Sequence, residues 1–305
     1  MSKIVLIGCG NVGMAYAYAL LASGANVDEL ALIDVNELYA EGQAQDLNDA
    51  VPYCENATHV FAGSYADCND ADLVVICAGR NQEKGESRQK LIDKNYDVFD
   101  DIIGKIKATA FDGIYLVATN PLDVMTTIAQ KLSGVEHSKV IGSGTVLDTA
   151  RLKFYVGRKI NVNPRHVHAY VIGEHGDSEF VAWDNALVAM NKAEFYLEAE
   201  EMQEIEEKVR KSAYEIIDKK GYTCYGIGMS LVKITNAILH DSHEVLTVSA
   251  YDEESGVYYS RPCVVSRNGI QEIVDLQLIK SDRQKLEHSI NEIKQSYNNI
   301  PNHKN

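Results

Sequence analysis

The segment that most constrains the fold is Gly8-Cys9-Gly10-Asn11-Val12-Gly13, close to the N-terminus. It follows the apolar run 3–7, which has the composition of a buried strand, and it precedes the small and apolar residues 14–22, which are typical of a helix. Its glycines permit a tight turn, close approach of the backbone to a phosphate, and close packing of helix on strand. The helix N-terminus would offer free N–H groups and a positive dipole end to an anion. The order strand, glycine-rich turn and helix therefore predicts a βα unit that binds phosphate at the turn.

A carboxylate follows where the ribose of a dinucleotide would need one. The apolar run 30–33 predicts a second strand, and Asp34 comes directly after it. An acidic side chain at this point binds both ribose hydroxyls and repels a 2′-phosphate. We therefore predict a site for NAD rather than NADP, formed by Gly8, Gly10, Val12, Gly13 and Asp34.

Strands and helices continue to alternate through the first half of the chain. Apolar runs predict strands at 58–61, 72–77, 114–118 and 139–141, and periodic segments predict helices at 35–50 and 91–110. Pro121 is expected to be the first residue of a further helix. Such alternation predicts an α/β fold with a Rossmann doubly wound parallel sheet. Ligands of such sheets bind at the carboxyl ends of the strands, where Asp34, Gly79 and Asn120 fall.

The pattern changes after Gly142. Helices are predicted at 148–158, 198–221, 225–239 and 281–297, a strand at 167–172, and an antiparallel sheet from 244–250, 256–265 and 272–278. No low-complexity linker divides the chain. We predict a NAD-binding Rossmann domain over 1–142 and an α+β catalytic domain over 143–305, with the active site in the crevice between them.

Composition narrows the class of protein. The 305 residues include 29 Lys and Arg against 44 Asp and Glu, which gives a formal charge of −15. This acidity argues against nucleic-acid binding, and no apolar run is long enough to cross a membrane. The six cysteines form no CxxC pair, which predicts reduced thiols in a cytoplasmic protein. The histidines, including the pairs His166/His168 and His240/His243, form no clear metal site, so no metal is predicted.

One histidine lies in a setting suited to proton transfer. Gly173-Glu174-His175-Gly176-Asp177 follows the predicted strand 167–172 and places an imidazole in a tight turn. Histidine suits proton transfer because its ordinary pKa lies near neutrality. A single histidine at a turn is more often structural, so its interpretation depends on its partners.

Two further segments offer such partners. Asp148 and Arg151 are three residues apart, on one side of a predicted helix, a spacing that usually means a surface ion pair. Alternatively, Asp148 orients His175 while Arg151 grips a carboxylate through two parallel hydrogen bonds. The polar segment 79–88 is either a solvated loop or a lid that brings Arg88 to a substrate.

Five motifs together resemble the L-lactate/L-malate dehydrogenase family. They are the glycine-rich turn 8–13, Ala118-Thr119-Asn120-Pro121, Leu147-Asp148-Thr149-Ala150-Arg151, the His175 turn 173–177, and Lys220-Gly221-Tyr222-Thr223. Their order and spacing extend the resemblance over essentially the whole chain. It implies an enzyme with a Rossmann NAD domain followed by an α+β catalytic domain.

The resemblance also implies roles for individual residues. His175 would be the acid/base that protonates a keto oxygen, with Asp148 as its partner. Arg88 would polarise the carbonyl, Arg151 would bind the substrate carboxylate, and Asn120 would contact substrate and cofactor. The cofactor site would extend beyond the glycine-rich turn and Asp34 to Tyr65, Gly79, Thr119, Asn120 and Ser143.

The choice of substrate depends on two positions. Malate dehydrogenases have arginine where this chain has Gln82, and a neutral side chain there leaves the second carboxylate of oxaloacetate unpaired. Thr223 also resembles the lactate branch, so (S)-lactate and pyruvate are the predicted substrates. Arg80 and Lys84 depart from the Ala and Pro usual in lactate enzymes, which makes this lid more charged.

Two alternatives remain open. The segments 180–183 and 221–223 resemble L-2-hydroxyisocaproate dehydrogenases, which take bulkier 2-keto acids. A catalytically silent NAD-binding protein is the alternative from another class. The presence of all four of His175, Asp148, Arg88 and Arg151 argues against it.

Regulation and assembly are implied by the resemblance alone. Many bacterial lactate dehydrogenases bind fructose 1,6-bisphosphate through an Arg and a His, and the matching positions here are Lys153 and His168. Lysine keeps the charge but lacks the planar guanidinium group of arginine. The alternative is that Lys153 and His168 are ordinary surface residues. The family also implies a homotetramer, or at least a dimer.

Overall fold

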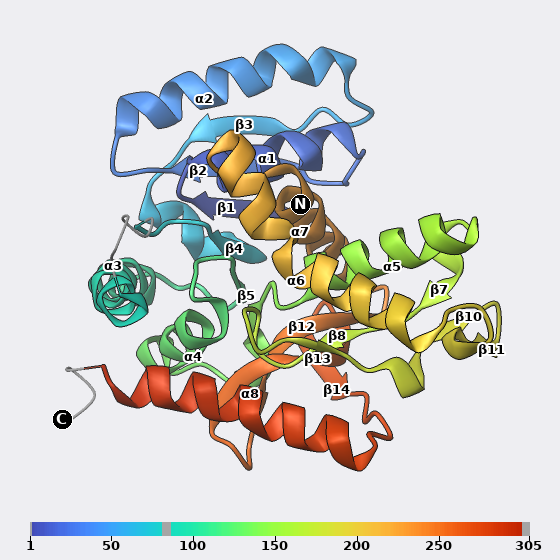
Figure 1. Cartoon of the computed structure of the whole chain (residues 1–305). Coiled ribbons are helices and arrows are strands. Elements are labelled where there is room, and N and C mark those ends of the chain that lie inside the picture. Colours follow the sequence, from blue (N-terminus) through green and yellow to red (C-terminus); the bar gives the residue numbers. More distant parts are fainter. Residues whose placement is uncertain (1, 81–86, 301–305) are drawn as a thin grey trace.

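A nine-stranded sheet forms the centre of the computed structural model, which describes residues 2–80 and 87–300 (Figure 1). The strand order is β14-β13-β12-β6-β5-β4-β1-β2-β3. Its parallel part consists of β1 (Lys3–Ile7), β2 (Glu29–Ile33), β3 (His59–Ala62), β4 (Leu73–Ile76), β5 (Ile114–Val117) and β6 (Val140–Gly142). The order runs outward from β1 in both directions, which is the arrangement of a doubly wound sheet.

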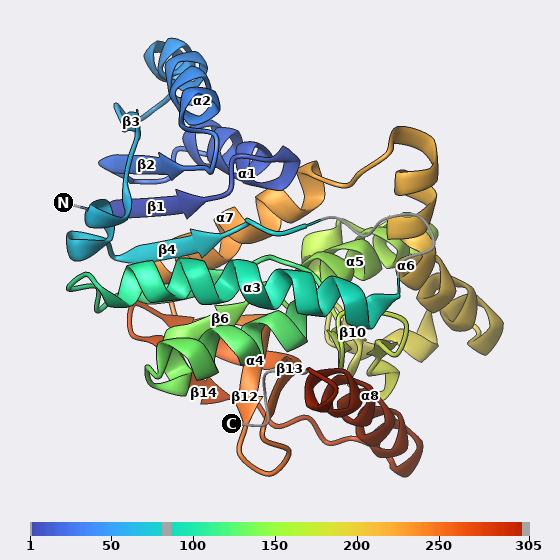
Figure 2. The same cartoon turned by 90° about the vertical axis from the view of Figure 1, so that its left-hand side faces the viewer.

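Helices cover both faces of this sheet. They include α1 (Asn11–Ala22), α2 (Glu37–Ala50), α3 (Arg88–Lys107) and α4 (Leu122–Ser133). Side chains of β1 alternate between two cores, so that Ile4 and Leu6 pack with α1 while Val5 and Ile7 lie in the core that α3 and α4 complete. Figure 2 shows α3 and α4 on the near face of the sheet. The predicted α/β fold with a doubly wound parallel sheet is confirmed.

The antiparallel strands continue the same sheet. They are β12 (Glu244–Asp252), β13 (Val257–Ser266) and β14 (Gly269–Ile273). Strand β12 pairs with β6 through Ser249 and Gly142. The antiparallel pairing agrees with the prediction, but the predicted strand 272–278 was wrong, because Gly269 (φ +90°) turns the chain into β14 earlier. Leu276 and Leu278 instead pack beside β8 and β9.

The single strand predicted at 167–172 was also wrong. The structure has β7 (Val167–His168), which pairs with β10 (Leu187–Val188) and thereby joins β11 (Asn191–Lys192), and β8 (Val171–Ile172), which pairs with β9 (Phe180–Val181). The backbone N–H of Val171 donates to Thr149 Oγ1 (3.0 Å) and its carbonyl accepts from Thr145 Oγ1 (2.6 Å). These two side chains occupy the backbone hydrogen-bonding groups of Val171 that a longer strand would need. His166 lies in a 3₁₀ helix and therefore does not share a strand with His168.

The remaining helices are α5 (Val146–Ile160), α6 (Ala199–Lys220), α7 (Tyr225–Leu239) and α8 (Lys280–Asn298). Helix α6 ends at a left-handed Gly221 (φ 89°), with lysines in its last turn where the helix dipole favours cations. Pro121 is the N-cap residue of α4 rather than its first residue, which corrects the prediction. Short 3₁₀ helices are η1 (Val51–Tyr53), η2 (Tyr65–Asp70), η3 (His137–Lys139), η4 (Pro164–His166), η5 (Trp183–Asn185) and η6 (Ala193–Phe195).

The first and second halves of the chain share one core. Helix α7 packs directly on α1, and a Cβ on Gly228 would lie 2.8 Å from the backbone of Ala15. The buried hydroxyl groups of Tyr16 and Thr235 are 2.9 Å apart across this contact. Within residues 2–80 and 87–300, no helix combines the length and the apolar character needed to cross a bilayer.

Candidate active site

The glycine-rich turn has the geometry of a phosphate loop. Gly8 has a φ of +101°, and a Cβ on it would lie 2.5 Å from the backbone nitrogen of Ala78. A Cβ on Gly13 would lie 2.0 Å from the Gly8 carbonyl oxygen. A Cβ on Gly10 meets nothing within 4 Å, so this glycine leaves open space at the N-terminus of α1. Two glycines are therefore required by packing, and the third leaves room for a ligand.

This difference gives a prediction with a built-in control. Gly10→Ala is expected to fold normally, because Gly10 has an ordinary φ of −74°, but its methyl group enters the space beside the helix N-terminus. NADH binding, measured by fluorescence titration, should weaken about tenfold or more. Gly13→Ala should instead lower the melting temperature, because overpacking a tight contact costs about 1–3 kcal/mol or more. Equal NADH affinity in Gly10→Ala and the parent protein would contradict the assignment.

Asp34 is held beside the glycine-rich turn. Its Oδ2 accepts a hydrogen bond from the Cys9 backbone N–H (2.9 Å), and its Oδ1 accepts one from Asn36 N–H (3.0 Å). The carboxylate therefore has a fixed orientation at the carboxyl end of β2. Its remaining lone pairs can accept the two hydroxyl groups of a ribose.

A buried amide connects the ends of β4 and β5. Asn95 of α3 is fully buried; its Oδ1 accepts from Arg80 N–H (2.7 Å) and its Nδ2 donates to the Asn120 carbonyl (2.8 Å). Thr119 Oγ1 donates to the Ala78 carbonyl (2.7 Å), and a Cβ on Gly79 would lie 2.5 Å from Thr119 Cγ2. Asn95 was not predicted, although its place on the apolar side of α3, between Leu91 and Phe99, is a detectable signal.

The other predicted cofactor residues lie at the same edge of the sheet. Tyr65 begins η2 just after β3, half-buried, with Lys105 Nζ 5.2 Å from its ring centre. Ser143 follows β6, and its N–H donates to the Val117 carbonyl (2.8 Å). The fold thus brings the predicted cofactor residues to the carboxyl ends of the parallel strands, where an open sheet of this type binds ligands.

His175, Asp148 and Arg151 meet where the turn after β8 approaches α5. His175 Nδ1 is 2.7 Å from Asp148 Oδ2, and Arg151 Nη1 donates to Asp148 Oδ1 (2.8 Å). The His175 backbone N–H donates to Asp123 Oδ2 (2.7 Å), and Asp123 Oδ1 accepts from Ser249 Oγ (2.5 Å). With Nδ1 held by a carboxylate, Nε2 is the ring nitrogen left to exchange a proton with a substrate.

The electrostatics favour a charged imidazole. Burial lowers the pKa of His175, but the charge and hydrogen bond of Asp148, together with Glu179 and Asp123, raise it to about 9. Burial raises the pKa of Asp148, yet His175 and Arg151 hold it below its ordinary value. At neutral pH the pair is therefore an imidazolium and a carboxylate, which is the state that can donate a proton to a keto oxygen.

Arg88 contacts the residue before the histidine rather than the histidine itself. It is the first residue of α3, and its Nη2 is paired with the carboxylate of Glu174. The Glu174 side chain is only 2% exposed and also accepts from Ser178 Oγ (2.5 Å), whereas that of Arg88 is 41% exposed. Glu174 thus anchors the Arg88 head group next to the His175 turn.

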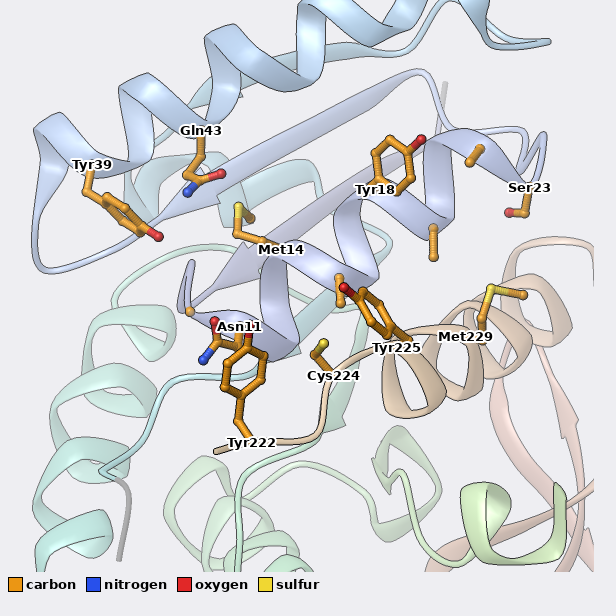
Figure 3. Close-up of a pocket in the computed structure, with 14 residues that line it drawn as sticks. Asn11, Met14, Tyr18, Ser23, Tyr39, Gln43, Tyr222, Cys224, Tyr225 and Met229 are labelled. Carbon is orange, nitrogen blue, oxygen red and sulfur yellow. The ribbon is translucent and has the colours of Figure 1, made fainter. Parts of the chain in front are cut away.

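Only one of the two substrate discriminators, Thr223, lies within the described residues. Gln82 lies outside the described residues, as does Lys84. Thr223 lies, partly exposed, in the connection between α6 and α7. Its neighbours Tyr222 and Cys224 line a cavity of about 640 Å³ along α1 and α2, and Figure 3 shows both with Asn11 among the residues around it. A smaller cavity of about 300 Å³, between α5 and α6, reaches Arg151.

The sequence matches two family profiles in tandem. Residues 2–142 match the NAD binding domain of lactate/malate dehydrogenase, and residues 145–303 match its alpha/beta C-terminal domain. The chain belongs to the lactate/malate dehydrogenase family. It is 46% identical to L-lactate dehydrogenase 2 of Bacillus cereus and 45% identical to L-lactate dehydrogenase 1 of Bacillus anthracis, each over 97% of both chains.

Solved structures of this family agree with the fold. The minor L-lactate dehydrogenase of Enterococcus mundtii, in its ligands-bound form, superposes with a TM-score of 0.96 at 39% identity over 99% of both chains. The lactate dehydrogenase MGS-M5, from a deep-sea metagenome library of the Medee basin, has a TM-score of 0.95 at 42% identity and covers 97% of this chain and 98% of its own. The resemblance that the five motifs indicated is confirmed.

One group of side chains in this family member has the spacing of metal ligands. Within the described part of the chain, single atoms of Asp148, His175 and Glu179 lie within 4.8 Å of one another. Both oxygens of Asp148 are already bonded, one to His175 and one to Arg151. Asp148 is therefore already occupied as the hydrogen-bond partner of His175 and Arg151. Glu179 and Asp123 were missed at the sequence level, because nothing in their local pattern distinguishes them from other acidic residues.

The predicted effector residues lie on neighbouring elements. Lys153 is half-buried on α5, where burial and the nearby Lys233 lower its pKa, and among the described residues it has no ion-pair partner. His168 is exposed on β7, which packs against α5. The structure gives no hydrogen bond between these two side chains within residues 2–80 and 87–300.

Proposed function

We propose that the protein is an NAD-dependent L-lactate dehydrogenase that interconverts (S)-lactate plus NAD⁺ with pyruvate plus NADH and a proton. The observation that carries this proposal is the joined set of His175, Asp148 and Arg151 in a chain of this family. The curated relatives named L-lactate dehydrogenase support it, because their similarity extends over nearly the full length. A catalytically silent NAD-binding protein would have no use for a buried carboxylate that connects a histidine to an arginine.

The arrangement suggests how the chain's own residues act. NADH, when bound, supplies the hydride that reaches C2 of pyruvate. Arg151 binds the substrate carboxylate, and His175 donates its Nε2 proton to the keto oxygen. Asp148 keeps Nδ1 protonated and stabilises the imidazolium before transfer. Arg88 stabilises the charge that develops on the oxygen, an electrostatic contribution of about 3 kcal/mol.

The substrate assignment is tested by a panel of 2-keto acids. Pyruvate, 2-ketoisocaproate, phenylpyruvate and oxaloacetate should be ranked by kcat/KM from the loss of NADH absorbance. We expect pyruvate first and oxaloacetate far behind, because Gln82 offers no charge to a second carboxylate. A preference for 2-ketoisocaproate would instead make the protein an L-2-hydroxyisocaproate dehydrogenase. The cavity beside Arg151, lined in part by Leu147, Ala150 and Ile216, is the reason to include the bulkier acids.

We also propose that fructose 1,6-bisphosphate is an effector that binds at Lys153 and His168. A half-buried lysine without an ion-pair partner among the described residues supports an anion site there. Lactate-forming activity should be measured with and without the bisphosphate. A lowered apparent KM for pyruvate is expected, and an unchanged KM would refute the proposal.

We propose further that the protein is a homo-oligomer, with a tetramer as the family form. Large apolar side chains that are at least half exposed on α1, α2, α5 and α7 support a covered surface: Tyr18, Leu38, Phe154, Tyr225 and Met229. Light scattering at micromolar concentration tests this, and a monomer would overturn it.

We also place the boundary between the NAD-binding and catalytic domains at residues 142 and 143. Six free cysteines support a cytoplasmic location.

A further inference from the structure

Glu179 is a third ionisable group at the His175 site. It lies four residues after His175, in the turn between β8 and β9, and is only 5% exposed. One oxygen of its carboxyl group, one of Asp148 and one ring nitrogen of His175 lie within 4.8 Å of one another. Its backbone N–H donates to the Gly176 carbonyl (3.2 Å), which ties it to the turn that carries the histidine.

No hydrogen bond between described residues reaches this carboxyl group, although neither of its oxygens is among the side-chain atoms that are completely buried without a partner. Arg210 of α6 faces it, but Arg210 Nη2 donates to the Glu179 backbone carbonyl (3.2 Å) and to the Glu206 carboxylate (3.1 Å). Glu206 also accepts from Trp183 Nε1 (3.0 Å). The charge of Arg210 is therefore matched by Glu206. A carboxyl group in a largely buried residue with no protein donor is costly, so its placement against His175 calls for an explanation.

The charged groups around this pair come from several elements. His175 is faced by Asp148 of α5, by Asp123 of α4 and by Glu179. Glu179 is faced by Asp148, His175, Arg151 and Arg210. Burial and Asp148 raise the pKa of Glu179 well above its ordinary value, against the lowering effect of the cations. Because each group changes the charge that the other meets, the two titrate together.

We propose that Glu179 is a positioning residue for the proton of His175: facing the imidazole from the side of β9, its carboxyl group stabilises the imidazolium and extends keto-acid reduction to higher pH. This inference rests on the proposed dehydrogenase function. Asp148 fixes the orientation of the ring through a direct hydrogen bond, whereas Glu179 acts across space on the charge alone. Two carboxyl groups therefore share one imidazolium and one guanidinium in a site that is largely closed to water.

The sign of the effect follows from the chemistry. Reduction of a keto acid requires protonated His175, so kcat/KM falls as pH rises through the pKa of this group. Oxidation of a hydroxy acid requires the neutral ring, so its rate rises through the same pKa. Glu179→Gln keeps the size of the side chain and removes the charge. Both profiles should then move to lower pH, by about one unit for charges roughly 5 Å apart at a partly screened site.

The kinetic test compares Glu179→Gln with Asp184→Asn. Asp184 is an exposed carboxylate in the same segment and is not among the charges that face His175, so it controls for the loss of one negative charge. We expect the shift in Glu179→Gln alone, for pyruvate reduction and lactate oxidation alike. A lower rate at every pH without a shift would mean that Glu179 is only structural, and would overturn the inference.

A direct titration separates this inference from the proposed function. The pKa of His175 can be followed by NMR of imidazole resonances in the protein alone, with the resonance assigned by its absence in His175→Gln. The pKa should fall in Glu179→Gln and stay near the parent value in Asp184→Asn. Glu179→Asp, which keeps the charge, should lie between parent and Glu179→Gln, and it serves if the glutamine variant folds poorly. An unchanged pKa overturns the inference; a shifted pKa in a protein inactive toward all keto acids overturns the function only.

Discussion

Replacing His175 by alanine should lower kcat for pyruvate reduction about a hundredfold or more. The imidazole is the donor that the geometry offers to a keto oxygen, since Nδ1 is held 2.7 Å from Asp148 and Nε2 remains available. Without it the proton must come from water, which is a much weaker acid than an imidazolium. NADH affinity should change little, because the glycine-rich turn and Asp34 lie at the carboxyl ends of other strands.

The control for this substitution is His288→Ala. The His288 side chain is 67% exposed on α8 and faces solvent, so its loss should leave the rate within a factor of two. Stopped-flow measurement of NADH oxidation under single-turnover conditions separates chemistry from product release. Near-normal turnover in His175→Ala would remove the histidine from its assigned role.

Replacing Arg151 by lysine should lower kcat/KM for pyruvate about a hundredfold or more, although the charge is kept. A guanidinium presents parallel N–H groups to a carboxylate while a further N–H holds Asp148, as Arg151 Nη1 does at 2.8 Å. A lysine head group is a point charge and cannot serve both partners from one plane. We expect KM to rise and kcat to fall, because the same contact also fixes Asp148 beside His175.

Pyruvamide makes this prediction selective. It lacks the carboxylate, so the rise in KM in Arg151→Lys should largely disappear with it, while the part of the kcat loss that comes from the Asp148 contact should remain. Arg158→Lys, an exposed exchange on the same helix, provides the matched control. A loss of equal size with pyruvate and pyruvamide would show that Arg151 acts through the structure of α5 and not through the substrate.

Local patterns predicted most of the fold, because buried strands and amphipathic helices can be recognised from the order of apolar and polar residues over a short stretch of sequence. Helix α7 was predicted with its observed ends, Tyr225 and Leu239. The errors arose where residues far away in the sequence determine where a strand begins or ends. The segment 167–172 is apolar enough for one strand, but the hydroxyl groups of Thr145, the N-cap residue of α5, and of Thr149 on α5 bind the backbone at Val171 and divide it.

The same distinction applies to the active site. His175, Asp148, Arg151 and Arg88 were predicted because they fall within spaced motifs. Asp123, Asn95 and Glu179 could not be found in that way, because their importance comes from burial and from contacts that only the folded chain creates. Asp123 shows this most clearly: its carboxylate holds the His175 backbone although the two residues are 52 positions apart.

The pairing of β12 with β6 has a mechanical consequence. The sheet edge with the glycine-rich turn and the turn that carries His175 are attached to one continuous hydrogen-bonded framework, and the packing of α7 on α1 holds it together further. Within residues 2–80 and 87–300 this framework joins the two halves of the chain directly, so we expect their alignment to be set during folding. It follows that reactivity and tertiary structure should be lost in a single cooperative step on heating.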